Sequence, residues 1–179
     1  MTQNIIITGN RHSQKHSNIM EMDPYNSKTA TLLREYDTKN NTSYFKFNEK
    51  TCEKYSKREY EIARMTEPVF SILLYTLNKE ENIKSICLVE YENDLKQLRV
   101  SIDSSNKDII GDVADYAFKN MKMKSIIVFA NKNDKNLLKE LISNGYTPLF
   151  DDYDSKAQLP FLIEKDVDAY KDERSIICV

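Results

Sequence analysis

The stretch from Leu98 to Leu149 changes its apolar spacing from a period of two residues to a period of about 3.6, and then repeats the change. Leu98, Val100 and Ile102 alternate with polar residues, which is typical of a strand with one buried face. A polar loop follows, and the apolar residues between 110 and 121 then have the spacing of a helix that lies on a sheet. The loop carries Ser105 three residues before Asp108, a pattern close to a capping box, so we expect the helix to begin at about Ile109.

The second half of this stretch predicts another strand and another helix. Residues 125–130 form an uninterrupted apolar run, typical of a strand that is covered on both faces and runs parallel to its neighbour. Asn133 or Asp134 can cap the following helix, which we expect to end at the left-handed stop signal Asn144-Gly145. The connection between the two parallel strands should be right-handed. The expected core is therefore of the α/β (α+β) class, with the order βαβα.

Two hairpins are expected on either side of this core. Residues 83–102 read as two strands joined by a turn at 92–94. After Gly145 the chain offers YTPLFDD, a polar turn, and LPFLIEK, which read as a second hairpin. The sequence thus predicts a mixed sheet with a central hairpin, the βαβα core and a C-terminal hairpin.

The N-terminal part gives weaker signals. We expect a strand at 5–8, a helix at 27–37, a short alternating strand at 43–47 and a helix over 51–65. Thr66-Glu67-Pro68 resembles a helix start, with a hydroxyl cap and a proline in the first turn, so a further helix is expected to reach residue 77.

A chain of 179 residues is long enough for one domain with a good core. We expect one globular unit, in which residues 1–50 form an N-terminal extension that packs its first strand and helix on the core. Residues 51–179 should then form the domain that contains the βαβα pattern.

Composition excludes several classes of protein. A net charge of −2 provides no field that would attract nucleic acid. The three cysteines are widely spaced, which argues against a disulfide framework or a zinc site and favours the cytoplasm. His12 and His16 lie four residues apart, but a solvated loop is the better interpretation than a metal site, and we expect no metal. No apolar run is long enough to span a membrane, and no membrane partner is expected.

The order of strand, loop, helix and strand, followed by a helix that ends at Gly145-Tyr146, resembles the acetyl-CoA-binding half of the GNAT (GCN5-related N-acetyltransferase) superfamily. The resemblance covers roughly residues 83–164. In that family a loop of the form [RQ]-x-x-G-x-[GA] holds the pyrophosphate of CoA on backbone N–H groups. Those positions fall on residues 106–111, where only Gly111 matches and Ile109 replaces the first glycine, so the chain resembles a divergent member of the family with a degenerate loop.

The second family signature lies on the helix that ends at Gly145. Asp134 stands at the position of the family's asparagine. Leu141 stands at the position of the tyrosine that often protonates the departing CoA sulfur, and a leucine cannot donate a proton. If this chain transfers an acyl group, another residue or water must be the acid, or the thiolate leaves unassisted.

The resemblance implies acetyl-CoA as co-substrate and an amine as acceptor. Glu90 would lie near the acceptor amine as a candidate for general base, although a solvent-facing glutamate at the edge of the hairpin is the simpler interpretation. The positions that the resemblance assigns to the cofactor are Val100, Ser101, Ile102, Ser105, Asn106, Lys107, Ile110, Gly111 and Asp134.

Three functions remain open from the sequence. The first is an acetyl-CoA-dependent N-acetyltransferase. The alternative is a catalytically inactive GNAT-fold module for binding or assembly, because fold alone does not decide activity. The third is a nucleotide-binding α/β protein, although the chain contains neither a G-x-G-x-x-G motif nor a Walker loop. The apolar end of VDAYKDERSIICV can pack on a partner, so a homodimer is also an option.

Overall fold

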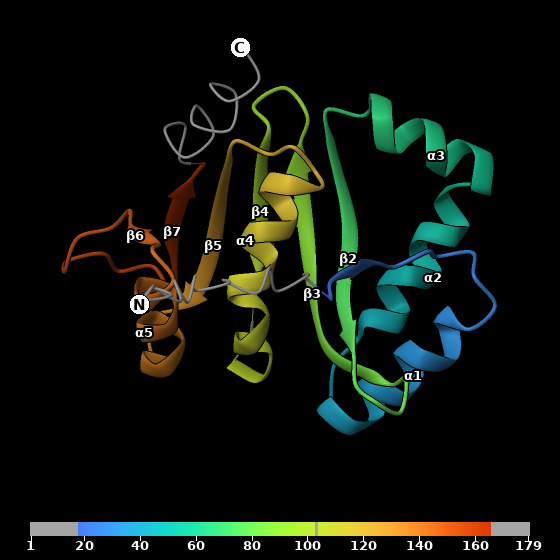
Figure 1. The fold of residues 1–179 in the computed structure, drawn as a ribbon, viewed down its shortest axis with the longest axis horizontal. Coiled ribbons are helices and arrows are strands. Elements are labelled where there is room, and N and C mark those ends of the chain that lie inside the picture. The colour runs from blue at the N-terminus through green and yellow to red at the C-terminus, as the bar shows by residue number, and fades with distance from the viewer. Residues whose placement is uncertain (1–17, 103, 166–179) are drawn as a thin grey trace, which may run out of the picture.

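The computed structural model describes residues 18–102 and 104–165, which form one mixed sheet with helices on its faces (Figure 1). The strand order is β1-β2-β3-β4-β5-β7-β6. The strands are β1 Met20–Glu21, β2 Val69–Leu77, β3 Ile83–Glu92, β4 Gln97–Ser101, β5 Ser125–Asn131, β6 Thr147–Pro148 and β7 Gln158–Glu164. The helices are α1 Thr29–Asn40, α2 Tyr44–Lys54, α3 Lys57–Thr66, the 3-10 helix η1 Ser104–Ile109, α4 Ile110–Lys119 and α5 Lys135–Ser143.

The βαβα core and both hairpins are confirmed. β3 and β4 are antiparallel, and β4 and β5 are parallel, with Val100 opposite Val128. β7 then pairs antiparallel with both β5 and β6. The helix that joins β4 to β5 begins at Ile110, one residue later than expected. Its N-cap residue is Ile109, with no side-chain capping hydrogen bond, so the expected capping box does not start α4.

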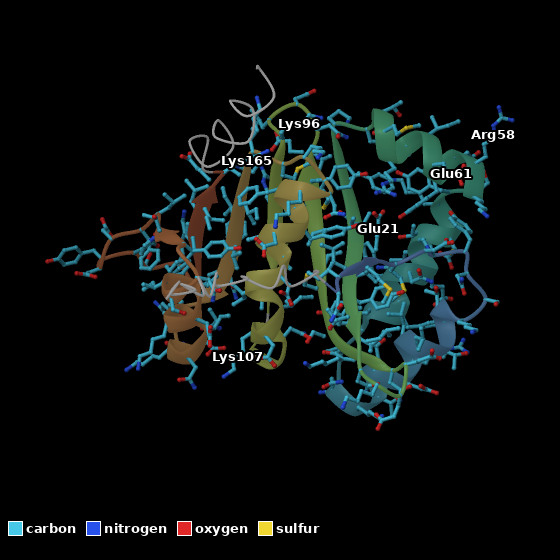
Figure 2. All side chains as sticks on the ribbon, in the orientation of Figure 1. Glu21, Arg58, Glu61, Lys96, Lys107 and Lys165 are labelled. Carbon is cyan, nitrogen blue, oxygen red and sulfur yellow. The ribbon has the colours of Figure 1, made fainter. Side chains whose placement is uncertain are left out.

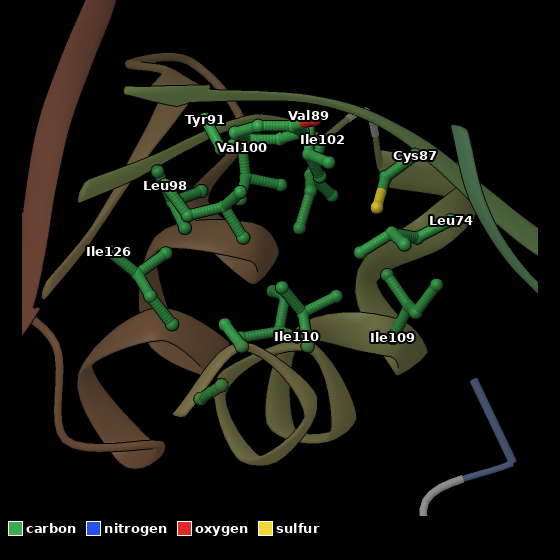
Figure 3. Close-up of a cluster of buried hydrophobic side chains, with 14 of the residues drawn as sticks. Leu74, Cys87, Val89, Tyr91, Leu98, Val100, Ile102, Ile109, Ile110 and Ile126 are labelled. Carbon is green, nitrogen blue, oxygen red and sulfur yellow. The ribbon is translucent and has the colours of Figure 1, made fainter. Parts of the chain in front are cut away.

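Two apolar clusters hold helices on the sheet. The larger cluster lies between the sheet and α4 and α5, and it contains Ile109, Ile110 and Val100, all at most 1% exposed. Figure 3 shows both isoleucines facing the side chains of the sheet. The smaller cluster joins α1 to β2 and β3 through Leu33 and Ile86, both fully buried. Figure 1 shows α1, α2 and α3 gathered at the β2 end of the sheet, with α5 at the opposite end.

The helix expected at residues 66–77 is wrong, because this segment is strand β2. Its side chains are buried on both faces, since α1 covers Leu73 and the larger cluster takes up Ile72 and Leu74. A strand buried on both faces loses the alternation that identifies a strand, and its apolar run can be read as a helical stripe. Pro68 then precedes the strand, where a missing N–H is also tolerated.

The strand expected at residues 43–47 is also wrong, because this segment begins helix α2. The Asp37 carboxylate accepts hydrogen bonds from the backbone N–H groups of Tyr44 (2.9 Å) and Phe45 (2.8 Å). This carboxylate of α1 thereby satisfies two of the N–H groups that a helix start leaves free. A cap supplied from a preceding helix has no local sequence pattern, so the alternating aromatic residues misled the prediction.

The remaining N-terminal predictions have mixed outcomes. The helix at 27–37 is confirmed as α1. The single helix expected over 51–65 is two helices, because the chain is extended at Tyr55 and restarts at Ser56, which forms a capping box with Glu59. The strand at 5–8 and the two histidines lie outside the described residues.

The proposed boundary after residue 50 falls within α2, and the division into an extension and a domain stays a prediction. Within 18–102 and 104–165, no group of three or more histidine, cysteine or acidic side chains could hold a metal ion. No helix in this described part is long and apolar enough to cross a membrane.

Candidate active site at the ends of β4 and β5

A groove of about 660 Å³ lies at the carboxyl ends of the parallel strands β4 and β5. The carboxyl ends of parallel strands are the usual ligand-binding position of α/β folds. The groove is lined by Ile102 after β4, by Asn131 at the end of β5, by the start of α5, and by Gln158 at the start of β7. The full lining is Ile102, Asn131, Asn133, Asp134, Asn136, Leu137 and Gln158.

Local hydrogen bonds fix the turn between β5 and α5. The Asn131 side chain accepts from the backbone N–H of Asn133 at 2.9 Å, and the Asp134 carboxylate caps α5 by accepting from Leu137 N–H at 3.1 Å. Asp134 is therefore held as the N-cap of α5, as the sequence predicted. The Asn136 side chain is exposed at the edge of the groove and has no such capping role.

The groove is rich in amides and poor in charge. Three asparagines and a glutamine line it, and Asp134 is its one charged lining residue among the described residues. Amide side chains both donate and accept hydrogen bonds, which suits a ligand that itself contains amides. Within the described part of the chain, the lining offers no cation for a phosphate group.

The segment between β4 and α4 is helical rather than an open loop. η1 runs directly into α4, and Ile109 at the junction has right-handed helical angles (φ −80°, ψ −14°). A 3-10 turn uses N–H groups in bonds to carbonyls three residues earlier, so fewer of them stay free for an anion. Ile109 does not obstruct the surface, because its side chain is 1% exposed and lies in the core.

Asn106 is buried and ties η1 to two other elements. Its side-chain oxygen accepts from the Tyr36 hydroxyl of α1 at 3.0 Å and from Ile86 N–H of β3 at 3.0 Å. The residue is 0% exposed. A side chain in this position holds η1 against β3 and α1, and the proposed contact of Asn106 with a cofactor stays a prediction.

The other residues assigned to the cofactor lie at different depths. Ile102 and Asp134 both line the groove. Val100 is fully buried against the helices, whereas Ser101 is exposed on the opposite face of β4. The side chains of Val100 and Ser101 thus point to opposite faces of the sheet. A ligand on one face of β4 could therefore contact the side chain of only one of these two residues.

Four predicted residues lie on η1 and the first turn of α4. Ser105 belongs to η1, and Lys107 in the same helix is half-buried. Ile110 is 0% exposed in the core. Gly111 lies next to the end of α5, where an added Cβ would come within 3.0 Å of the Asn144 side-chain oxygen. The glycine therefore permits close packing of α4 on the end of α5.

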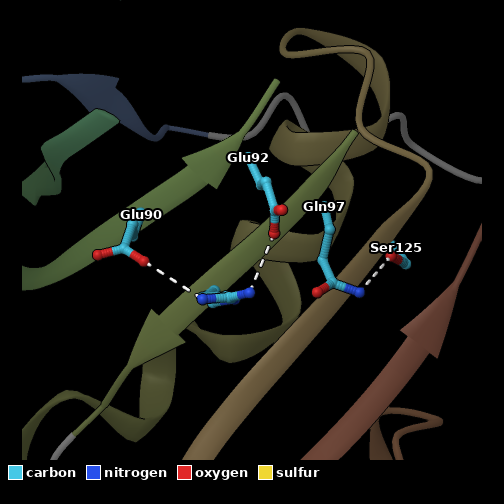
Figure 4. A network of polar contacts seen from close by, with 5 residues as sticks. Glu90, Glu92, Gln97 and Ser125 are labelled. Carbon is cyan, nitrogen blue, oxygen red and sulfur yellow. Dashed lines mark hydrogen bonds and ion pairs between the residues drawn. The ribbon is translucent and has the colours of Figure 1, made fainter. Parts of the chain in front are cut away.

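Glu90 lies on the sheet face opposite α4 and forms an ion pair with Arg99 on β4 (Figure 4). The Arg99 Nη1 to Glu90 Oε1 distance is 3.6 Å, and the same guanidinium donates to Glu92 at 3.0 Å. The Glu90 side chain is 43% exposed, so a second molecule can reach it. Ser101 lies opposite Leu88 in the register, which puts Glu90 about 7 Å along the strand from the end of β4.

Leu141 is fully buried in α5, so the position at which the family often has a tyrosine faces the core.

Sequence reasoning missed Asn131, Asn136 and Gln158 as lining residues of the groove. The cluster of asparagines between residues 131 and 136, directly after a buried strand, was an available signal. Gln158 could not be found this way, because only the pairing of β5 with β7 places it beside Asn131.

Solved structures with the same fold are N-acetyltransferases. A mutant of the spermidine N-acetyltransferase SpeG from Vibrio cholerae superposes with a TM-score of 0.54 at 10% identity, over 82% of this chain and 94% of the other. A glutamate-to-glutamine mutant form of the spermidine/spermine N-acetyltransferase SpeG from the same organism gives 0.55 at 11% identity, over 87% and 97%. The expected GNAT fold is therefore confirmed, with a strongly divergent sequence.

Comparison of the sequence with known families and proteins gives no further information on activity. No family model matches the chain, and no curated protein matches it. The likeness accordingly establishes the fold, and activity must be argued from the site.

Proposed function

We propose that this protein is an N-acetyltransferase that binds acetyl-CoA in the groove at the ends of β4 and β5 and transfers the acetyl group to an amine. The observation that carries the proposal is the groove itself, which lies where the parallel pair β4–β5 of a GNAT fold ends. The fold alone would leave activity undecided.

The residues present fit part of acetyl-CoA well. The amides of Asn131, Asn136 and Gln158 line the groove and match a chain that contains amide groups. The pyrophosphate end is less well provided for, and its expected partners are Lys107 and the N–H groups at the start of η1. We therefore expect weaker cofactor binding than a glycine-rich loop would give.

Acetyl-CoA supplies the activated acyl group when bound. The protein's part is to hold a neutral amine beside that group, since positioning is a large share of the rate gain in such transfers. Glu90 is our candidate to take the proton from the amine, directly or through a water molecule. Leu141 cannot protonate the departing sulfur, so we expect the thiolate to leave unassisted or to be protonated by water.

A GNAT-fold module without catalysis is the second candidate. The continuous helix from η1 into α4 favours it, because the open phosphate loop of the family is missing. The ion pair of Glu90 with Arg99 favours it too, because this carboxylate is already engaged by a guanidinium.

The two candidates are separated by measuring binding and transfer independently. Acetyl-CoA and free CoA are titrated by calorimetry, and acetylation of a panel of primary amines and polyamines is followed by mass spectrometry. Binding with transfer supports the enzyme, and binding without transfer to any amine supports the inactive module. No binding at millimolar acetyl-CoA would reject the groove as a cofactor site.

A matched pair of substitutions locates the cofactor. Asn136→Glu adds a negative charge at the groove but also places an acidic residue in the first turn of α5, where it favours the helix. Asn120→Glu adds the same charge at an exposed position directly after α4, near the ends of β4 and β5 that lie away from the groove. We expect Asn136→Glu to weaken acetyl-CoA binding by about tenfold and Asn120→Glu to leave it unchanged.

Two further parts of the proposal have their own tests. The unpaired Cys52 and Cys87 fit a reducing compartment, so we propose a cytoplasmic location, which a tagged protein in its native cell would test. The homodimer stays a prediction that sedimentation velocity would test.

A further inference from the structure

A second hollow lies between β1 and α3, at the other side of the molecule from the groove. Its volume is about 270 Å³. Figure 2 shows Glu21 and Glu61 on the side of the sheet that carries β1 and α3, away from Lys107 in η1. The residues used below line it, and we call it the Tyr60 hollow: the largely buried Glu21 and Tyr60 on the inside, and the exposed Asp23, Lys57, Glu61 and Arg64 around the rim.

Tyr60 contributes a hydroxyl without a partner to this hollow. The residue is 7% exposed, and its ring packs edge-on against Tyr25 and Phe70 at centroid distances of 5.6 and 5.3 Å. No residue in the described part of the chain forms a hydrogen bond with the Tyr60 hydroxyl. The neighbouring Tyr25 differs, because its hydroxyl donates to the Tyr55 carbonyl at 2.6 Å. The Tyr60 hydroxyl is not among the fully buried unpaired atoms, so it is accessible and is an available ligand contact in the hollow.

Glu21 provides a charged acceptor next to it. One Glu21 oxygen pairs with Arg64, and the other has no partner among the described residues. The Glu21 side chain is 15% exposed, and burial raises the pKa of this carboxyl while Arg64 opposes the rise. Burial, together with the nearby Glu21 charge, also raises the pKa of Tyr60, so its hydroxyl stays protonated at neutral pH.

The charges of the hollow favour a cation. Its lining contains three carboxylates and two cationic side chains, and one of these cations, Arg64, is already paired with Glu21. The carboxylates of Asp23 and Glu61 on the rim outnumber the single ammonium of Lys57. A small ligand with an ammonium group could donate one hydrogen bond to the free Glu21 oxygen and one to the Tyr60 oxygen.

We propose that the Tyr60 hollow is a binding site for a primary alkylammonium ion, held by the Glu21 carboxylate and the Tyr60 hydroxyl. This proposal does not rest on acyl transfer, since it needs neither acetyl-CoA nor the groove. A site of this kind would let the protein bind an amine at a position separate from the groove at β4 and β5.

The probe is butylammonium chloride, titrated into the ¹⁵N-labelled full-length protein and followed by amide chemical shifts. Sodium butyrate and butan-1-ol are the matched anionic and neutral probes. We expect saturable shifts at Glu21, Tyr60 and Arg64 with butylammonium only, with a dissociation constant of about 1–10 mM.

Substitutions assign the contacts. Tyr60→Phe removes only the hydroxyl and should weaken binding about fivefold to tenfold. It should leave thermal stability unchanged, because that hydroxyl is accessible to water in the hollow, unlike that of Tyr146, and has no protein partner to lose. Glu21→Gln keeps the size of the side chain and should weaken binding further. Tyr153→Phe, at a tyrosine that is 93% exposed, is the control that should change nothing.

Several results would overturn the proposal. One is the absence of saturable shifts at these residues up to about 50 mM butylammonium, a concentration about fivefold above the weakest expected dissociation constant. Equal affinity of wild type, Tyr60→Phe and Glu21→Gln would show that the amine binds elsewhere. Stronger binding of butyrate than of butylammonium would assign the hollow to anions. None of these outcomes depends on whether acetyl-CoA binds the groove, so failure here leaves the proposed function standing.

Discussion

Two buried tyrosines in this fold should respond in opposite ways to loss of the hydroxyl group. Tyr146 is 3% exposed and Tyr36 is 6% exposed, so both rings contribute to the core. The Tyr36 hydroxyl donates to the Asn106 side chain at 3.0 Å. The Tyr146 hydroxyl is buried and has no hydrogen-bond partner among the described residues. Burial, with a smaller contribution from Cys87, raises the pKa of Tyr146, so the hydroxyl stays protonated.

The magnitude follows from the cost of an unpaired buried polar group. Such a group costs about 1–3 kcal/mol relative to its hydrated state, and an apolar replacement removes that cost. We expect Tyr146→Phe to increase the free energy of unfolding by about 1 kcal/mol. Tyr36→Phe removes a made hydrogen bond and leaves Asn106 with one donor fewer, so it should decrease stability by about 1–2 kcal/mol.

The measurement is urea unfolding followed by far-UV circular dichroism for the wild type and both variants. The dependence of the free energy on urea should be the same in all three, so that midpoints compare stability directly. Thermal midpoints should differ from that of wild type by about 2–4 °C per kcal/mol, in opposite directions for the two variants. A loss of about 1 kcal/mol or more in Tyr146→Phe would refute the reasoning, because it would mean that the hydroxyl is hydrogen-bonded in solution.

Three shorter predictions concern the site and the core. Asp134→Ala removes the cap of α5 and should cost about 1 kcal/mol of stability in urea unfolding, while an unchanged midpoint would argue against the cap. Burial raises the pKa of the Cys87 thiol to about 12, so at pH 8 it stays protonated, and iodoacetamide should label it only in urea. Labelling in native protein as fast as that of the partly exposed Cys52, read by mass spectrometry, would contradict this. In an active enzyme, Glu90→Gln should slow acetyl transfer about a hundredfold. Glu92→Gln alters the other partner of Arg99 and should leave the rate unchanged. Equal transfer rates in the wild type and Glu90→Gln would exclude Glu90 as the general base.

The central part of the fold could be predicted because its signals are local. The switch between the two apolar periods over residues 98–149 is visible from residues that are close together in the sequence. The structure contains β4, α4, β5 and α5 in this stretch, as predicted. The stop at Gly145 is local too, because its φ of 88° favours glycine.

The prediction of the N-terminal half failed where tertiary contacts decide the local structure. β2 is buried on both faces and so lost its alternation, and α2 begins on a carboxylate supplied by Asp37 of α1. Propensity and pattern carry no information on either contact. The site shows the same division. Asp134 was found from its capping pattern, but the burial of Asn106 depends on Tyr36, 70 residues earlier in the chain.

The binding of acetyl-CoA by the groove at β4 and β5 is tested most directly by isothermal titration calorimetry of the full-length protein. We predict saturable binding at micromolar acetyl-CoA in the wild type and in Asn120→Glu, with about tenfold weaker binding in Asn136→Glu. Absence of heat at millimolar acetyl-CoA, or identical binding by all three proteins, would contradict the assignment of this groove to the cofactor.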